Sequence, residues 1–447
     1  MKIPGMVPDI RNPILNIIAD EKWGISQDTI ESFEFAADET MALPRCVIRF
    51  TDTDDKRLAN LAGLGIGSPV SFTISEGDGD NPKAKLELLT PGLAGASQEL
   101  TPLSIAKVHS SGRASGISNF ELLLEHPWKI FKDFSSHAYA GKANSEIIKD
   151  LIEGAKGRGF DFEDIDKEQF FDSDEDGKIP RYKCGEGDLD FITKHLIPYT
   201  TINKNPAVFW VDELNCIHLD TFQNMYKGDA KVLVVMGGPE DLDDTAEGKL
   251  ISMDGVAYAS DRIVKIGSDN AEDIISILKP NVSIDDVSHM ISYTGHLLPK
   301  IAIGKLKKGL SDKAHVPVML KQMAVSDATD KKIYRNHPLS DLKAVALHEQ
   351  KLFNSMFTIE INTSFCGHLI HTGQNVEFYV KPDTSETPPT KSWMNGKWHV
   401  RGIKYYWEKG GILKNKLILI RPSFDLNKLT TSIFNIDDYY AVGMAGL

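Results

Sequence analysis

Hydrophobic and polar residues alternate in several short stretches of the first 130 residues. Cys46, Ile48 and Phe50 fall on one face of a predicted strand, and the same period of two recurs over Val70–Ile74 and Phe120–Leu124. Because successive side chains of a strand point to opposite faces, this period is typical of half-buried strands. Several such strands separated by turn-forming runs predict a small β-sandwich or barrel.

Apolar residues take a helical spacing over residues 147–155. Asn144 and Ser145 precede them and are residue types that cap helix N-termini, so we expect a helix that begins there. A second helix is predicted from Asp188 to Pro198, followed by a β-hairpin around residues 212–215. The middle of the chain is therefore predicted to combine α and β structure.

Strand patterns return over residues 232–267 and again from residue 357 onward. Between them, residues 268–335 are polar and weakly patterned, and Ser340 is predicted to cap a helix. The last strand contains four consecutive apolar residues, 417–420, which predicts burial on both of its faces. No internal repeat is visible in the sequence.

Composition narrows the class of protein. A chain of 447 residues with 41% hydrophobic and 25% charged residues has the profile of a soluble protein of about two to four domains. Its net charge of −13 argues against a general nucleic-acid or membrane-surface binder, which would be basic. The N-terminal residues lack the features of a signal peptide, and no apolar run has the length of a transmembrane helix. The four cysteines form no CxxC pair and are expected to be reduced thiols of a protein folded in a cytoplasm.

One acidic loop resembles the first part of a calcium-binding loop. Asp172, Asp174 and Asp176 alternate and precede Gly177, so their carboxylates could converge on one hard cation. The twelfth position is Lys183, where a bidentate glutamate is needed. We interpret the segment as a solvated acidic turn, and calcium binding stays an open alternative.

Other candidate motifs each lack a required residue. Residues His348–Leu352 begin like a zinc-binding HExxH helix, but leucine replaces the second histidine. Cys366 and His368 would lie on one face of a strand and His371 on the other, so we expect ordinary strand residues. The glycine-rich loop that ends at Gly67 leads into a strand, whereas a phosphate-binding loop leads into a helix. We therefore predict no catalytic, metal-binding or cofactor-binding residue, and no enzymatic activity.

Five segments from residue 134 onward follow one another in a family pattern. They are FSSHAYAGKANSEIIKDLIEGA, GEGDLDFITKHLIPYT, NPAVFWVDELNCIHLD, SDLKAVALHEQKLFNSMFTIEINTSF, and HTGQNVEFYV with GKWHVRGIKYYWEKGGILKNKLILIRP. Their order resembles the T4-type baseplate hub protein of contractile-tailed phages, to which tail protein D and the base of VgrG spikes are related. In that family the first three segments enter an α/β domain, and the last two complete a second barrel. The first 130 residues match only as a β-rich unit.

The resemblance implies an α+β, β-rich fold with two small β-barrels and an inserted, peripheral α/β domain. The domains implied are a first hub barrel (1–130), the α/β domain (131–230), the first part of a second barrel (231–267), a peripheral α/β extension (268–354), the remainder of the second barrel (355–422) and a C-terminal tail (423–447).

The resemblance also implies a structural role. The chain would be a homotrimeric ring adaptor that joins the hexameric tail tube to the trimeric central spike and contacts other baseplate proteins. DNA would pass through the acidic lumen without specific binding, and the protein would not insert into a membrane. It would belong to the virion tail baseplate and assemble in the host cytoplasm. Two alternatives stay open: a tail-associated hydrolase of cell wall or polysaccharide, and the hub-like base of a secretion-system spike.

Overall fold

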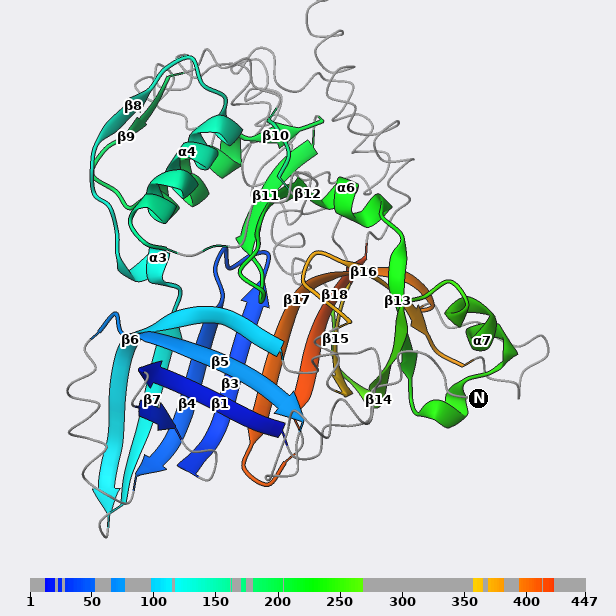
Figure 1. The fold of residues 1–447 in the computed structure, drawn as a ribbon. Helices are drawn as coiled ribbons and strands as arrows, with labels where there is room; N and C mark the ends of the chain where they lie inside the picture. Colours follow the sequence, from blue (N-terminus) through cyan, green and yellow to red (C-terminus); the bar gives the residue numbers. More distant parts are fainter. Residues whose placement is uncertain are drawn as a thin grey trace, which may run out of the picture.

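The computed structural model describes residues 13–20, 23–25, 29–52, 66–76, 98–114, 117–160, 162, 170–173, 180–203, 205–267, 357–364, 369–381, 394–411 and 413–421. Thirteen of the described strands belong to one large sheet, and two small sheets accompany a group of helices (Figure 1). The fold is α+β and rich in strands, which confirms the class predicted from the sequence.

The first strand unit occupies the N-terminal part of the chain. It comprises β1 (Pro13–Asp20), β2 (Trp23–Ile25), β3 (Ile30–Asp38), β4 (Arg45–Asp52), β5 (Pro69–Glu76), β6 (Gln98–Ala114) and β7 (Ile117–Glu125). These strands pair in the order β3-β4-β7-β6-β5-β1-β2 and form a strongly curved sheet. Cys46, Ile48 and Phe50 are all buried in one hydrophobic core, as the alternation predicted.

The second strand unit closes on itself. It comprises β13 (Ala230–Met236), β14 (Gly255–Gly267), β15 (Phe357–Ser364), β16 (Asn375–Tyr379), β17 (Gly396–Glu408) and β18 (Lys414–Arg421). The order is β16-β13-β14-β15-β18-β17, and pairing of β16 with β17 completes a six-stranded barrel. Residues 417–420 of β18 are all buried, which confirms the prediction that both faces of this strand are covered.

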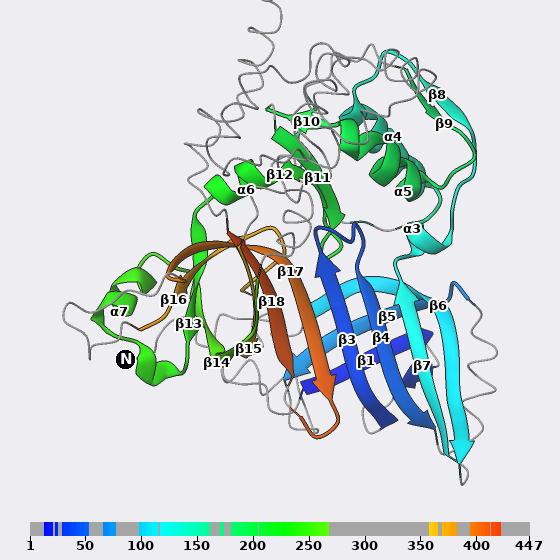
Figure 2. The same ribbon diagram turned by 180° about the vertical axis from the view of Figure 1, so that it is seen from behind.

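The two strand units are joined edge to edge. The outer half of β17 pairs with β3 in antiparallel register, from Gly402 opposite Asp38 to Glu408 opposite Ser32. Both views show β17 and β3 side by side between the two units (Figure 2). One hydrophobic core, with Phe35 and Tyr405 stacked inside it, runs through the joint.

An α/β unit packs against one end of the sheet. Its elements are α3 (Pro127–Ile130), β8 (His137–Tyr139), α4 (Asn144–Gly157), β9 (Arg181–Lys183), α5 (Asp188–Phe191), a π-helical turn (Ile192–Leu196), a 3-10 turn (Ile197–Tyr199), β10 (Thr201–Ile202), β11 (Asn205–Val211), β12 (Ile217–Thr221) and α6 (Phe222–Lys227). The predicted apolar stripe of α4 is buried against Trp128 and Phe209 in a separate core. No helix of the described residues has the length and apolarity needed to cross a bilayer.

The helix α4 begins at Asn144, as predicted, but its capping residue differs from the prediction. The N-cap residue is Ala143, whose backbone N–H donates to the Glu146 carboxylate at 2.8 Å. The Asn144 side chain instead accepts from Arg181 Nε at 3.0 Å and donates to Thr200 Oγ1 at 3.1 Å. Ser145 contacts Ser173. The two polar side chains that the sequence predicted to cap the helix thus form hydrogen bonds with residues of other segments.

The region predicted to be β-rich over residues 232–267 also contains a helix. Strands β13 and β14 are parallel neighbours, and α7 (Asp244–Leu250) lies between them in sequence. Asp243 accepts a hydrogen bond from Ala246 N at 3.0 Å, so an acidic N-cap was the signal available in the sequence. The predicted helix after Ser340 lies outside the described residues.

Candidate assembly site: a polar junction between two related strand units

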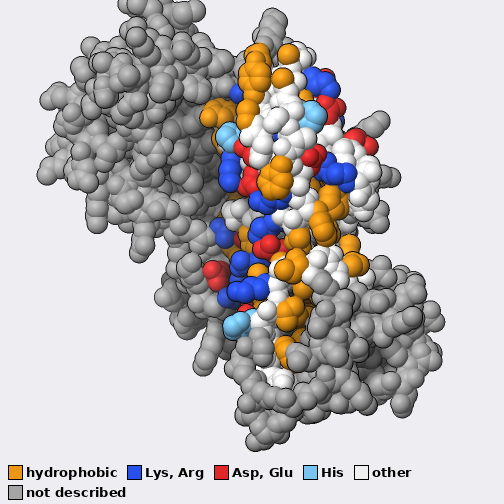
Figure 3. Space-filling model, turned by 90° about the vertical axis from the view of Figure 1, so that its left-hand side faces the viewer, with side chains coloured by type: hydrophobic (Ala, Val, Ile, Leu, Met, Phe, Trp, Pro, Cys, Tyr) orange, Lys and Arg blue, Asp and Glu red, His pale blue; other side chains and the backbone are white. Residues whose placement is uncertain are grey.

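One face of the molecule carries a groove between the first strand unit and the α/β unit. Figure 3 views the molecule from the side on which β6 and α3 lie in Figure 1, and hydrophobic, basic and acidic side chains are intermixed on this face. The groove has a volume of about 760 Å³, and Phe131 and Phe160 stack along it. Its charged residues are paired, because Arg158 binds Asp133 at 2.8 Å and Lys132 binds Asp190 at 2.8 Å. These contacts hold the wall of the groove together.

The tip of the β11–β12 hairpin is a tight turn built around Asp212. The Asp212 carboxylate accepts backbone hydrogen bonds from Leu214 and Cys216, each at 2.9 Å. Asn215 adopts a left-handed conformation (φ 67°), which asparagine tolerates better than most residues. His218 supports the turn from β12, with its Nε2 at 2.8 Å from the carboxylate. The predicted hairpin around residues 212–215 therefore exists, and several hydrogen bonds hold its tip in one conformation.

The hairpin tip is bonded to the first strand unit. Thr101 of β6 donates its backbone N–H to the carbonyl of Glu213 at 2.9 Å and its hydroxyl to the carbonyl of Asp212 at 2.8 Å. His126 lies 3.3 Å from the Asn215 amide oxygen. Burial lowers the pKa of His126 to about 4 despite this hydrogen bond, so the imidazole is neutral at neutral pH.

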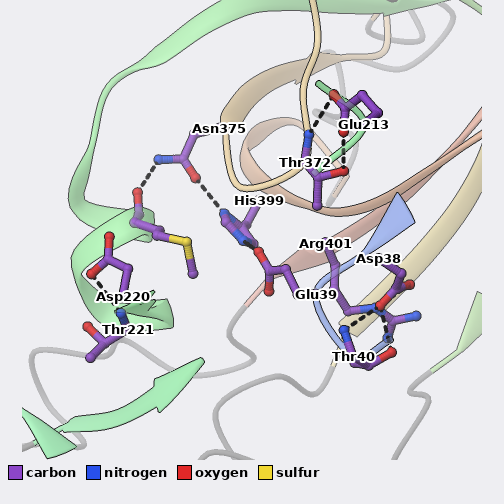
Figure 4. Close-up of polar contacts among 11 residues, drawn as sticks. Asp38, Glu39, Thr40, Glu213, Asp220, Thr221, Thr372, Asn375, His399 and Arg401 are labelled. Atoms are coloured by element: carbon purple, nitrogen blue, oxygen red, sulfur yellow. Dashed lines mark hydrogen bonds and ion pairs between the residues drawn. The ribbon is translucent and has the colours of Figure 1, made fainter. Parts of the chain in front are cut away.

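The same tip is bonded to the second strand unit. The fully buried Glu213 carboxylate accepts from the Thr372 hydroxyl at 3.0 Å and from its backbone N–H at 3.3 Å (Figure 4). His371 Nδ1 lies 2.9 Å from the same carboxylate. One glutamate thus ties the α/β hairpin to the loop that enters β16.

A second buried pair connects the strand units directly. His399 of β17 contacts the carboxylate of Glu39, which follows β3, and both side chains are almost fully buried. The other ring nitrogen of His399 lies 3.2 Å from the Asn375 amide oxygen. The Asn375 amide nitrogen donates to the carbonyls of Met225 and Gly228, at 2.6 and 2.8 Å. Both ring nitrogens of His399 therefore face side-chain oxygen atoms that can accept a hydrogen bond.

Carboxylate–histidine pairs can serve general acid–base catalysis, and the pairs Glu213–His371 and Glu39–His399 also connect different parts of the fold. Each joins segments that are distant in sequence, and each is enclosed by the elements it connects. Among the residues that the structure describes, no group of three or more His, Cys, Asp or Glu side chains could hold a metal ion. The arrangement fixes the relative position of three parts of the chain.

Of the candidate residues in the calcium-like loop, the structure describes Asp172 and Lys183. Asp172 binds Lys149 at 2.9 Å, whereas Asp174 and Asp176 lie outside the described residues. Lys183, at the twelfth loop position, is buried and donates to the Asp133 carbonyl at 2.7 Å and to the Asp188 carboxylate. The lysine that departs from the calcium pattern is thus an internal ion-pair partner within the α/β unit.

His371 does not lie in a strand, which corrects the sequence interpretation. It belongs to the loop before β16, where Gly373 has a φ of +93° and turns the chain. Gly67 lies in the predicted turn into a strand. Cys366, His368 and residues 348–352 lie outside the described residues. Sequence reasoning missed the role of Glu213, because nothing local marks a partner 158 residues away.

The contact between the Glu213 carboxylate and the His371 ring predicts that the stability of the fold depends on pH. Burial acts against the charged imidazole, but the hydrogen bond to Glu213 and the charges of Glu213 and Asp212 outweigh it and raise the pKa of His371 above 6.5. Because the pKa of His371 is higher in the folded than in the unfolded protein, protonation of His371 stabilises the fold. This stabilisation is complete below a pH of about 6.5, the ordinary pKa of histidine, and is lost as the pH rises through the pKa of the folded protein. We expect urea unfolding to show a stability gap between the wild type and His371→Gln that narrows from mildly acidic to alkaline pH. A difference in stability between the wild type and His371→Gln that does not change with pH would show that the charged His371 ring is not stabilised by Glu213.

Five strands of each unit follow the same order, although no repeat is visible in the sequence. The first unit has β5-β6-β7-β4-β3 and the second has β16-β17-β18-β15-β14, and all of these neighbours are antiparallel. The strand that begins each unit, β1 or β13, runs in a different direction relative to its neighbour. Strand β1 is antiparallel to β5, whereas β13 is parallel to β16. The two units are therefore topological relatives.

Local irregularities repeat as well. The long strand of each unit carries an irregularity at the equivalent place, after Ile105 in β6 and after Val400 in β17. Ile105 accepts from Gly67 N at 2.8 Å, and Val400 accepts from Gly373 N at 2.9 Å. Both glycines have positive φ, +96° and +93°. Equivalent bulges and turns at equivalent registers make the correspondence residue by residue.

Comparisons with known proteins agree with this fold. The sequence matches no protein-family model and no curated protein. The crystal structure of the tail protein from Neisseria meningitidis MC58 matches with a TM-score of 0.50 and 11% identity, over 92% of this chain and 96% of that chain. The 43 kDa tail protein of prophage MuSo2 from Shewanella oneidensis matches with a TM-score of 0.50 and 10% identity, over 92% of this chain and 99% of that chain. The chain thus shares its fold with these tail proteins, as the sequence resemblance predicted.

Proposed function

We propose that the chain is the hub subunit of a phage-tail baseplate, a homotrimeric ring that joins the hexameric tail tube to the trimeric central spike. In this proposal, residues 1–130 form one ring-building domain, and residues 231–267 with 355–422 form the other. Residues 131–230 form an outer α/β domain that contacts neighbouring baseplate proteins. The protein acts by its geometry, and it belongs to the virion tail.

The observation that supports this proposal is the pair of related strand units in one chain. A tube with six-fold symmetry and a spike with three-fold symmetry need an adaptor that presents both. Each chain contains two related strand units, so three copies present six similar units around a three-fold axis. A closed ring of three copies is a point-group symmetry that homo-oligomers commonly adopt. The net charge of −13 suits a lumen through which DNA passes without binding.

The oligomeric state tests the proposal. Size-exclusion chromatography with light scattering on the full chain is expected to give three times the 49.6 kDa of one chain. Negative-stain images are expected to show a three-fold ring with a central hole. A chain that stays monomeric at high concentration, alone and with its spike protein, would contradict the hub function.

A further inference from the structure

We propose that the ring closes by a β-sheet joint between copies, in which the outer half of β6 in one copy pairs antiparallel with the outer half of β14 in a second copy. This inference rests on the proposed trimer and goes beyond it, because it names the two strand edges and their register. Its basis is the joint that already links the two units within one chain.

The joint within the chain uses only part of β17. Before its irregularity, β17 pairs with β16, up to His399 opposite Asn375. Beyond it, the same edge of β17 pairs with β3, from Gly402 to Glu408. The strand thus leaves its own barrel and extends the sheet into the next unit. Ile403 and Tyr405 in this outer half are fully buried.

Strand β6 repeats this arrangement, except that its outer half pairs with no described strand of a neighbouring unit. Its first part pairs with β5, up to Ser104 opposite Pro69, and its other edge pairs with β7 along the whole outer half. No described strand pairs with the β5-side edge of β6 beyond the irregularity. Val108, the equivalent of the buried Ile403, has 40% of its surface exposed. An apolar side chain is therefore exposed where its counterpart is covered by the neighbouring unit.

Strand β14 offers the complementary edge. It is the equivalent of β3, since each is the outer neighbour of the strand that pairs with the last strand of its unit. The residues 255–259 of β14 pair with β13, and β15 covers the other edge up to Gly267. Within the described residues, the β13-side edge from residue 260 to residue 267 has no partner strand. This is the edge on which β3 receives β17.

The correspondence fixes the register of the proposed joint. Lys404 lies opposite Ala36 in the joint within the chain. The registers of β6 with β7 and of β14 with β15 make His109 the equivalent of Lys404 and Gly267 the equivalent of Ala36. His109 of one copy is therefore expected opposite Gly267 of the next copy.

The two edges lie far apart, with β6 at the left of Figure 1 and β14 to the right of its centre, beside β13. A contact between two different surfaces is heterologous, and it closes when three copies complete a ring. An open strand edge presents unpaired N–H and C=O groups that readily pair with another chain. Ring closure gives these two edges a partner strand in every copy, which gives the joint a physical reason to form.

Paired cysteines test the register. Hydrogen bonds from Glu39 N to Arg401 O and from Lys409 N to Glu31 O mark the bonded pairs at the two ends of the joint within the chain. Strict alternation makes Lys404 and Ala36 a non-bonded pair, in which the two Cβ atoms are about 4.5–5.5 Å apart. The equivalent variant, His109→Cys with Gly267→Cys, is therefore suited to an intermolecular disulfide.

The experiment uses the full chain with Cys184→Ser, because Cys184 is exposed. Mild oxidation is expected to give dimers and trimers on non-reducing gels that revert to monomers on reduction. The matched control is Val108→Cys with Gly267→Cys, because a shift of one residue moves the side chain to the opposite face of the sheet. It is expected to cross-link no more than the single-cysteine variants.

Light scattering before oxidation separates the possible results. A trimer that cross-links only in the predicted register supports the joint. A trimer that does not cross-link above the controls, or that cross-links equally in both registers, overturns the joint and leaves the hub function standing. A chain that never forms a trimer overturns both proposals.

Discussion

Replacing Glu39 with alanine is expected to lower the free energy of unfolding by about 1–3 kcal/mol, because it leaves a buried ring nitrogen of His399 without its hydrogen-bond partner. The Glu39 and His399 side chains are 3% and 0% exposed. Without the carboxylate, the His399 ring keeps only the Asn375 amide oxygen as a partner. The ring nitrogen that faced Glu39 is then buried without a hydrogen-bond partner at the contact between the two strand units. Urea unfolding followed by tryptophan fluorescence measures the loss, because Trp398 neighbours His399 in β17.

An exposed pair in the same sheet is the matched control. Arg49 and Glu121 form a cross-strand ion pair at 2.8 Å, with 62% and 38% of their side chains exposed. Water screens such a pair, so Glu121→Ala is expected to cost less than about 1 kcal/mol. Equal losses for Glu39→Ala and Glu121→Ala would show that the junction contributes no more than a surface contact.

Replacing Gly373 with alanine is expected to cost about 2–5 kcal/mol. The backbone has a φ of +93°, where an L side chain costs about 1–2 kcal/mol. The new Cβ would also lie 2.8 Å from Cζ2 of the buried Trp210, and overpacking of this kind costs about 1–3 kcal/mol. Relief of that contact would displace the loop that presents His371 and Thr372 to Glu213.

Gly410 separates the two causes of this loss. It has a φ of +77°, and a Cβ there would meet no atom within 4 Å. Gly410→Ala is therefore expected to show the backbone cost alone, about 1–2 kcal/mol in thermal or urea unfolding. If the two glycine variants lose the same stability, the contact between Gly373 and Trp210 does not constrain the loop.

Periodicity in the sequence was sufficient to find most of the strands and the main helix. The alternation around Ile48 and the unbroken run at residues 417–420 correctly predicted one buried face in the first case and two in the second. The prediction succeeds because the side chains that face the core of a strand or helix must be apolar, so the geometry of the element sets the spacing of apolar residues in the sequence. The helix α7 was missed because its seven residues carry few apolar side chains and little periodic signal.

The candidate site could not be read from the sequence in the same way. Asn144 and Ser145 are good capping residues, but the fold uses them for contacts with other segments. Glu213 and His371 appear to local analysis as a turn residue and a strand residue. They form a junction only because β11 and β16 are brought together by the packing of three units.

The sequence by itself determined the α+β class, the strand-rich ends, the helical middle and the resemblance to tail hub proteins. Only the tertiary structure decided the order of the strands, the topological repeat of the two units and the edges that stay open. The physical reason is distance along the chain. Hydrophobic period is a local property, whereas strand order depends on hydrogen bonds between distant segments such as β3 and β17. Next to this pairing, Glu39, which follows β3, contacts His399 across 360 residues of sequence.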